Sequence, residues 1–222
     1  MDLYVYVAWM LIASQVFFST LPLKNYFFAL AKYNKKHTHY SPRVVLIIPC
    51  KNLDAYFEQN IASFYAQDYE NYLLWFVVED KADPAYEPLC RLRDKLADST
   101  KAIDVRVLIA GAGQECSQKI HNLLYAYRQI PENIQTLAFA DSDICVKPTW
   151  LHHLVYPLRH PETRGAVTGY RWFVPKTGNL ATLALSAINA KIAQLMGNTP
   201  FNHAWGGSMA IHVQIFRELG IE

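Results

Sequence analysis

Two carboxylates, Asp141 and Asp143, follow directly after an apolar run at 136–140. Acidic side chains separated by one residue can hold a divalent cation directly or through water, and Mg²⁺ and Mn²⁺ prefer such oxygen ligands. Both cations usually complete their coordination shell with substrate phosphates. A turn in which one aspartate caps the next helix would use the same residues, so the motif alone leaves both interpretations open.

Further charged residues stand at the ends of two earlier apolar runs. Lys51 follows the run at 43–50, and Glu79 and Asp80 close the next one. A carboxylate there can accept the N–H of a uracil ring or the hydroxyl groups of a ribose. A solvated turn is equally compatible with Glu79 and Asp80, and for Asp83 we favour the solvated turn.

Lys119 is a candidate for contact with a diphosphate, because it lies near the start of a predicted helix and helix N-termini favour anions. On its position alone, a surface lysine is the more common interpretation. Gly111 and Gly113 precede this helix. They do not form a phosphate-binding loop by themselves, because both the full Gly-x-Gly-x-x-Gly pattern and the Walker pattern are missing.

Strand-like and helix-like segments alternate along the chain and must position these residues. Apolar runs predict strands at 43–50, 72–79, 104–110, 136–140 and 165–170. Apolar spacing predicts helices at 54–66, 84–97 and 117–129, with a further helix opening at Pro148, since proline suits the first turn. This alternation indicates βαβ units and a mostly parallel sheet, and the continuously apolar strands fit a sheet covered on both faces.

The same architecture predicts where a ligand would bind. In open α/β sheets, ligands lie outside the carboxyl ends of the strands. Polar clusters follow four successive predicted strands at that edge: 51–54, 79–80, 111–113 and 141–143. This coincidence favours one ligand site over four unrelated turns, and it strengthens the metal interpretation of Asp141 and Asp143.

An uncharged run at residues 3–23 holds 16 apolar residues among 21. At about 1.5 Å per residue it can cross the roughly 30 Å hydrocarbon core of a bilayer. A buried core helix and a signal peptide are the alternatives, and the signal peptide is disfavoured because no basic region precedes the run and no small-x-small cleavage site follows it. We predict a transmembrane anchor over 1–31, a basic linker over 32–42 and an α/β domain over 43–222.

Charge predicts how the anchor is oriented. Asp2 precedes the run, whereas the residues from 24 to 43 hold five cations and no acid. By the positive-inside rule the α/β domain faces the cytoplasm after a single membrane pass, and the basic linker suits anionic headgroups. The rest of the chain is close to neutral, which argues against a nucleic-acid partner. The four cysteines are widely spaced, so neither a zinc site nor a disulfide framework is expected.

Two segments near the end of the chain have two interpretations each. The segment Trp205-Gly206-Gly207-Ser208 either lets the backbone approach a ligand closely or is only a turn; His203 beside it is a candidate pocket residue. Residues 179–197 carry one charge, Lys191, in 19 positions. A helix there is either buried in the domain or lies in the membrane interface near a lipid substrate, and we favour burial.

Six segments of the chain, in this order, resemble the ceramide-glucosyltransferase-like enzymes of glycosyltransferase family 21, which are closely allied to the family-2 enzymes with the GT-A fold. The resemblance extends from about residue 3 to the last residue and is most specific around Asp80 and Asp141. The segments are PCKN (49–52), VVEDKADPAYEPL (77–89), SQKIHNLL (117–124), ADSDICVKPTWL (140–151), GAVTGYRWFVP (165–175) and WGGSMAIHVQIFRELGI (205–221).

The resemblance implies a GT-A (Rossmann-like) fold and an inverting transfer of a sugar from a UDP-sugar to a lipid acceptor. Asp80 matches the family's nucleotide-binding aspartate, Asp141 its D-x-D-type aspartate with Asp143 as partner, and Lys119 and Asn122 a lysine and an asparagine of the nucleotide-side helix. We predict Mg²⁺ or Mn²⁺ as cofactor, held by Asp141 and Asp143. The predicted nucleotide-sugar-binding residues are Lys51, Glu79, Asp80, Lys119, Asn122 and Asp141.

In the family, a third aspartate and a Gln-x-x-Arg-Trp motif follow the segment that matches 205–221. That aspartate is the expected general base, which deprotonates the acceptor hydroxyl for attack at the anomeric carbon. No residue here matches it, so we expect a GT-A domain truncated at its C-terminus, with the donor-binding half and no catalytic base. The alternatives are a non-catalytic nucleotide-binding remnant of such an enzyme and a family-2 polysaccharide synthase, and the segment 77–89 favours the lipid enzymes over the synthase.

Overall fold

The structure is a computed structural model that describes residues 3–33, 40–171, 173–175, 177–197 and 202–220. Its contacts divide the chain into two compact units. We call residues 1–36 and 170–203 the helical unit, and residues 37–169 and 204–222 the sheet unit. The predicted boundaries of the anchor (1–31), the linker (32–42) and the α/β domain (43–222) stay predictions.

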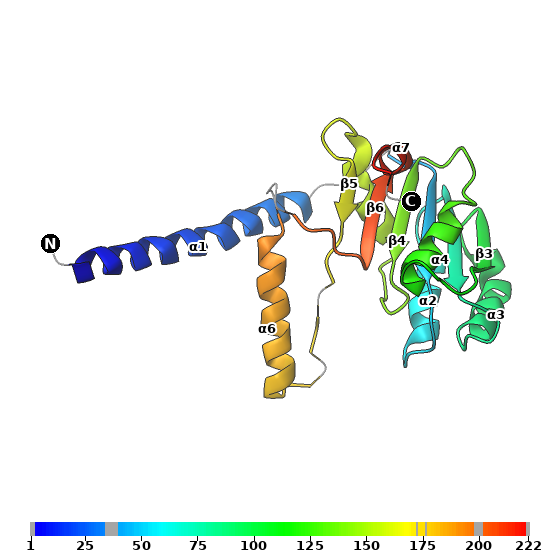
Figure 1. Ribbon diagram of the computed structural model, residues 1–222, viewed down its shortest axis with the longest axis horizontal. Coiled ribbons are helices and arrows are strands. Elements are labelled where there is room, and N and C mark those ends of the chain that lie inside the picture. The colour runs from blue at the N-terminus through cyan, green and yellow to red at the C-terminus, as the bar shows by residue number, and fades with distance from the viewer. Residues whose placement is uncertain (1–2, 34–39, 172, 176, 198–201, 221–222) are drawn as a thin grey trace. The chain divides into compact units, whose positions relative to one another are not determined.

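The sheet unit is built on one six-stranded sheet with the order β3-β2-β1-β4-β6-β5 (Figure 1). Strands β1 to β4 pair in parallel, and β6 runs antiparallel to both β4 and β5. The strands are β1 (Val44–Pro49), β2 (Tyr72–Val78), β3 (Asp104–Ile109), β4 (Thr136–Ala140), β5 (Ala166–Thr168) and β6 (Ser208–His212). The strand order reverses between β1 and β4, which is where such sheets bind ligands. The predicted mostly parallel α/β sheet is confirmed.

Helices cover both faces of this sheet. One face packs against α2 (Phe57–Tyr65), α3 (Tyr86–Leu96) and α5 (Trp150–Val155), and the other against α4 (Gln118–Tyr127) and α7 (Val213–Glu218). Short 3₁₀ turns follow α3 at Ala97–Ser99 and α5 at Tyr156–Arg159.

The core explains why the first strands are apolar throughout. In β1, Val44, Leu46 and Ile48 belong to the core on one face, whereas Val45 and Ile47 belong to the core on the other. Successive side chains of a strand point to opposite faces, and both faces of β1 are covered. Every residue of β1 except its last is therefore buried, and the apolar run shows no alternation.

Strand β6 was not predicted from the sequence. Its five residues, SMAIH, begin and end with polar side chains, so no apolar run marks it. Its position comes from antiparallel pairing with β4, in which Ala140 lies opposite Ser208 and Thr136 opposite His212. This pairing brings the residues that precede β6 to the carboxyl end of β4.

The helical unit contains α1 (Leu3–Tyr33) and α6 (Leu180–Leu195). The stretch Leu3–Phe28 is long and apolar enough to cross a membrane by length and composition, and its most apolar window is not buried. The expectation that the helix at 179–197 is buried is wrong. Leu180 is 84% exposed and Ile188 59% exposed, because α6 turns its polar face rather than its apolar face toward the rest of the unit.

Candidate functional site

A hydrogen-bonded ion pair at the carboxyl edge of the sheet joins Asp141 to Lys119. Asp141 follows the last residue of β4, and Lys119 lies in the first turn of α4. The Nζ atom of Lys119 donates to Oδ1 of Asp141 at 2.5 Å, with the two side chains 49% and 24% exposed. Ser117 fixes the start of α4, because its hydroxyl accepts the N–H of Ile120 at 3.4 Å. Two predicted site residues that are 22 positions apart are thus in direct contact.

The glycine segment that precedes β6 lies beside Asp141. The backbone N–H of Asp141 donates to the carbonyl of Gly207 at 3.3 Å. A side chain at Gly206 would meet no atom within 4 Å, so the backbone here borders open space. The segment Trp205-Gly206-Gly207-Ser208 thus lies beside Asp141, and the close approach of its backbone to a ligand stays a prediction. His203 is exposed and belongs to the helical unit.

Hydrogen bonds to neighbouring strands hold this glycine segment in place. Trp205 donates its N–H to the hydroxyl of Thr168 at 2.8 Å, and that hydroxyl lies 3.2 Å from the Trp205 carbonyl. On the other side, the indole Nε1–H of Trp150 donates to the hydroxyl of Ser208 at 3.1 Å. The segment is thus tied to β5 and α5, and its position next to Asp141 does not depend on its glycines alone.

A second pair of predicted residues meets at the ends of β1 and β2. Lys51 Nζ and Glu79 Oε2 lie 3.6 Å apart, and the side chains are 61% and 30% exposed. Asp80, the next residue, is exposed, and its Oδ1 accepts the N–H groups of Ala82 at 2.7 Å and Asp83 at 3.0 Å. Asp80 therefore shapes the turn that follows β2 while its carboxylate stays accessible from solvent.

Asp83 has a role that the sequence did not reveal. Its Oδ1 accepts the N–H of Asn52 and the N–H of Ala85, both at 2.9 Å. Asn52 has a φ of 59°, a left-handed conformation that is uncommon for a residue other than glycine. The expectation of a simple solvated turn at Asp83 is therefore incomplete, because this carboxylate ties the loop after β1 to the loop after β2.

Asn122 lies beneath the site. It is 2% exposed, and its Nδ2 donates to the carbonyl of Val77 in β2 at 3.3 Å. Its Oδ1 accepts from Nε2 of Gln118 at 2.7 Å. The bond to Val77 joins α4 to the end of β2, and the bond from Gln118, within α4, orients the Asn122 amide. Direct contact between Asn122 and a nucleotide stays a prediction.

Gln118 was not among the predicted residues, although it organises the loop after β3. Its Oε1 accepts the N–H of Gly113 at 2.8 Å, and its Nε2 donates to the carbonyl of Gly111 at 2.8 Å. Gly111 has a φ of 78°, which favours glycine. A side chain at Gly113 would approach Cβ of His121 to 2.9 Å. The backbone conformation at Gly111 and the close packing at Gly113 therefore explain why glycine occupies these positions.

Cys50 is a buried residue directly after β1, below the loops of the candidate site. It is 1% exposed, and burial raises the pKa of its thiol, with a further increase from the charge of Asp83 and an opposing hydrogen bond with Ser142. A thiol with a raised pKa stays protonated near neutral pH and is a poor nucleophile. Cys50 is therefore a packing residue between the loops after β1, β2 and β4.

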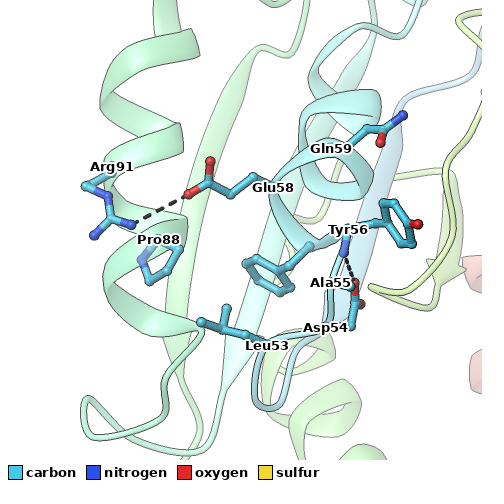
Figure 2. Close-up of a pocket in the computed structure, with 9 residues that line it drawn as sticks. Leu53, Asp54, Ala55, Tyr56, Glu58, Gln59, Pro88 and Arg91 are labelled. Carbon is cyan, nitrogen blue, oxygen red and sulfur yellow. Dashed lines mark hydrogen bonds and ion pairs between the residues drawn. The ribbon is translucent and has the colours of Figure 1, made fainter.

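No group of three or more His, Cys, Asp or Glu side chains converges as a metal site among the described residues. A surface hollow of about 350 Å³ lies between α2 and α3 (Figure 2). Its lining includes Asp54 of the polar cluster 51–54 and none of the six predicted nucleotide-sugar-binding residues. The Arg91–Glu58 pair at its edge, 3.7 Å apart, joins two largely exposed side chains. Such an exposed pair contributes little to stability, and we do not assign the hollow to the candidate site, because none of the six predicted nucleotide-sugar-binding residues lines it.

Comparison with known protein families identifies the family of this chain. The sequence pattern described as Glycosyl transferase family 21 matches residues 7–220. The chain belongs to glycosyl transferase family 21. This membership confirms the resemblance found in the segments around Asp80 and Asp141.

Solved structures share the fold of this family-21 chain. The mannosyltransferase PcManGT from Pyrobaculum calidifontis, solved in complex with GDP-Man and Mn²⁺, superimposes with a TM-score of 0.56 at 21% identity, covering 94% of this chain and 57% of the other. TarS from S. aureus gives a TM-score of 0.51 at 13% identity, covering 81% of this chain and 49% of the other. The chain thus spans about half the length of the structures it matches, and both likenesses support the GT-A-like architecture.

Proposed function

We propose that the chain is the donor-binding part of a membrane-anchored, inverting glycosyltransferase that transfers a sugar from a UDP-sugar to a lipid acceptor. The observation that carries this proposal is the contact between Lys119 and Asp141 at the carboxyl edge, next to the glycine segment before β6. Membership of family 21 supports the reaction class.

In this proposal, different charged residues at the carboxyl edge bind different parts of the nucleotide-sugar donor. Glu79 and Asp80, at the end of β2, accept from the base or the ribose, and Lys51 balances the charge of Glu79. Lys119, in the first turn of α4, binds the diphosphate, where the helix N-terminus adds a favourable field. Asn122 and Gln118 position that turn from below.

A divalent cation fits the remaining carboxylates. Asp141 already lies against one cation, the ammonium group of Lys119, and Asp143 is an exposed carboxylate two residues away. Mg²⁺ and Mn²⁺ are commonly held by one or two carboxylates and substrate phosphates, so a third protein ligand is not required. When bound, such an ion neutralises charge on the departing diphosphate. The relative solved with GDP-Man and Mn²⁺ supports this type of cofactor.

The lipid acceptor and the location follow from the N-terminal helix. The stretch Leu3–Phe28 is apolar enough to span a bilayer, and the cations after it favour a cytoplasmic sheet unit by the positive-inside rule. An anchored donor site works next to the bilayer surface, which favours an acceptor that resides there. We assign the edge residues to donor binding and none of them to deprotonation of the acceptor hydroxyl.

The experiment is a calorimetric titration of the full chain in lipid nanodiscs with UDP, with Mn²⁺, with Mg²⁺ and with EDTA. We expect binding that requires the metal and that Asp141→Asn weakens by about ten- to a hundredfold, the worth of one charge-assisted contact. Asp98→Asn is the matched control, because Asp98 is an exposed carboxylate in the 3₁₀ turn before β3, at the opposite edge of the sheet.

Three results would contradict all or part of the proposal. Equal weakening by Asp98→Asn, or no binding of UDP by the folded chain, would remove the donor site at this edge. Tighter binding of GDP than of UDP would keep the site and overturn the choice of base. Detection of a glycolipid product after addition of UDP-sugars to the same nanodiscs would extend the result from binding to transfer.

A further inference from the structure

Helix α6 directs its polar face inward. Asn189 is 3% exposed, and its Nδ2 donates to the hydroxyl of Tyr170 at 2.8 Å and to the carbonyl of Arg171 at 3.0 Å. Its Oδ1 accepts the N–H of Phe173 at 2.9 Å. Ser186, one turn earlier on the same face, donates to the Phe173 carbonyl at 3.2 Å. The extended segment that precedes α6 thus binds to the polar face of the helix.

The opposite face of α6 is apolar and exposed. We call it the outer face, and its large side chains are between 37% and 84% exposed: Leu180, Leu183, Leu185, Ile188 and Ile192. A surface helix of a water-soluble protein has the reverse arrangement, with its apolar stripe toward the core and its polar residues outward. An apolar exterior around a polar, hydrogen-bonded interior is the arrangement that a lipid environment favours.

The length and charge of α6 place it at the membrane surface rather than across it. Its 16 residues reach about 24 Å at 1.5 Å per residue, short of the roughly 30 Å hydrocarbon core. Its one charge, Lys191, is exposed near the end of the helix, and a lysine stem can carry its ammonium group to the headgroups. The Asn179 side chain caps the start of α6 by accepting the N–H of Thr182 at 2.9 Å.

Contacts between α6 and α1 determine the depth in the bilayer at which α6 would lie. Within the helical unit α6 contacts α1, and in Figure 1 the two helices run in clearly different directions. Gly197, just after α6, lies so close to Asn25 that a side chain there would collide with the Asn25 amide. Asn25 stands near the end of the apolar stretch Leu3–Phe28, which is where a spanning helix leaves the hydrocarbon core.

We propose that the outer face of α6 inserts into the boundary between headgroups and acyl chains, on the side of the bilayer where α1 emerges. The proposal rests on the membrane anchor of the proposed function. It adds a second contact with lipid, which holds residues 170–197 at the surface from which a lipid acceptor would be drawn. The occupant of the outer face is a bilayer that contains anionic lipid, since Lys191 is its single charge.

The test measures the depth of single fluorescent labels in the full chain. Cys90, Cys116 and Cys145 are replaced by serine, the buried Cys50 is kept, and an environment-sensitive dye is attached at one new cysteine at a time. The sites are Leu185→Cys and Ile188→Cys on the outer face, Ile12→Cys within α1, and Glu132→Cys on an exposed loop of the sheet unit. Nanodiscs of phosphatidylcholine and phosphatidylserine carry nitroxide quenchers at shallow or deep acyl positions, and iodide is the aqueous quencher.

We expect labels at 185 and 188 to be quenched most by the shallow nitroxide, the label at 12 by the deep one, and the label at 132 by iodide alone. If 185 and 188 respond only to iodide while 12 is deep, the inference is overturned and the anchor stands. If 12 also responds only to iodide, the anchor fails as well. Protection of 185 and 188 from every quencher would overturn the inference in favour of a protein partner, such as a second copy of the chain.

Discussion

The two units of the chain use the same apolar residue types in opposite ways. All seven residues of β2 are buried, and the charged residues of the sheet unit lie on its surface and around the site. In the helical unit, the leucine and isoleucine side chains of α1 and α6 whose exposure the structure describes are exposed, whereas Asn189 is buried. Apolar surface gains free energy by leaving water. The difference supports the proposal that the helical unit contacts lipid, whereas the core of the sheet unit is closed within its own two layers of helices.

This contrast explains why mean hydropathy is uninformative for the whole chain. The mean hydropathy of the chain is +0.01. It averages a sheet unit with buried apolar residues and a helical unit with exposed ones. The two units differ in which of their apolar residues are buried, and not in the types of apolar residue that they contain. The predictions below test that separation, first in the core, then at the site, and last at the membrane surface.

The largest expected effect comes from making one substitution in both units. Leu74→Ala removes a fully buried side chain from β2 and should lower the free energy of unfolding of the sheet unit by about 2–5 kcal/mol, because a cavity is left in the core. Leu185→Ala, on the outer face of α6 where the side chain is 54% exposed, should change it by less than about 0.5 kcal/mol. Urea unfolding of the full chain in nanodiscs, followed by tryptophan fluorescence, measures both.

These two variants control for each other, since the chemical change is identical. Equal losses of stability would mean that α6 is packed as a core helix and that the contrast between the units is wrong. A small loss for both would mean that β2 tolerates a cavity, against the complete burial of its seven residues.

The next effect distinguishes site residues from other surface charges in the sheet unit. Lys119→Met removes the ammonium group that lies against Asp141. Binding of UDP with Mn²⁺ should weaken about tenfold, because one charge-assisted contact to the diphosphate is lost. Binding of Mn²⁺ alone should tighten by about two- to fivefold, because a partly exposed competing cation is gone. Electron paramagnetic resonance of free Mn²⁺ measures the second quantity, and calorimetry the first.

Lys95→Met is the control for that pair of measurements, since Lys95 is an exposed lysine in the last turn of α3. It should leave both affinities unchanged. If Lys119→Met weakened both the metal and the nucleotide, Lys119 would support the loop structure instead of competing with the cation. If it changed neither, its assignment to the diphosphate would be wrong.

The sequence was sufficient to predict the parallel part of the sheet. Strands β1, β2 and β4 are mostly buried between two layers of helices, so their sequences are apolar runs, predicted at 43–50, 72–79 and 136–140. The edge strand β3, predicted at 104–110, has only half-buried apolar residues beside its charged ones. Strand β6 could not be predicted in this way, because its position depends on pairing with β4 across more than sixty intervening residues. The error on α6 has the opposite cause, since an apolar helix was assigned to a protein core when its polar face is the one that is buried.

For the site, the prediction of parallel strands was enough to place Lys51, Glu79, Asp80 and Asp141 at one edge of the sheet. The individual contacts were not predictable, because side-chain pairs such as Lys119–Asp141 join different βα units. The same holds for Asp83, whose bond to the Asn52 N–H spans 31 positions, and for Gln118, whose role depends on the exact path of the loop at 111–117. Local patterns predict elements, whereas these contacts depend on how the elements pack.

The smallest expected effect concerns the charge on the outer face of α6. Lys191→Gln should reduce the preference of this face for anionic lipid by about 1 kcal/mol, the usual worth of one lysine near such a surface, while the five apolar side chains keep the helix at the bilayer. A label at Leu185→Cys should therefore stay accessible to shallow nitroxides, and its quenching should depend less on the phosphatidylserine content. Lys95→Gln, in the sheet unit, should leave that dependence unchanged. Complete loss of quenching in Lys191→Gln would show that charge alone held α6 at the surface. The exposed leucine and isoleucine side chains would then have no role in lipid binding, and the proposed contrast between the two units would be wrong for α6.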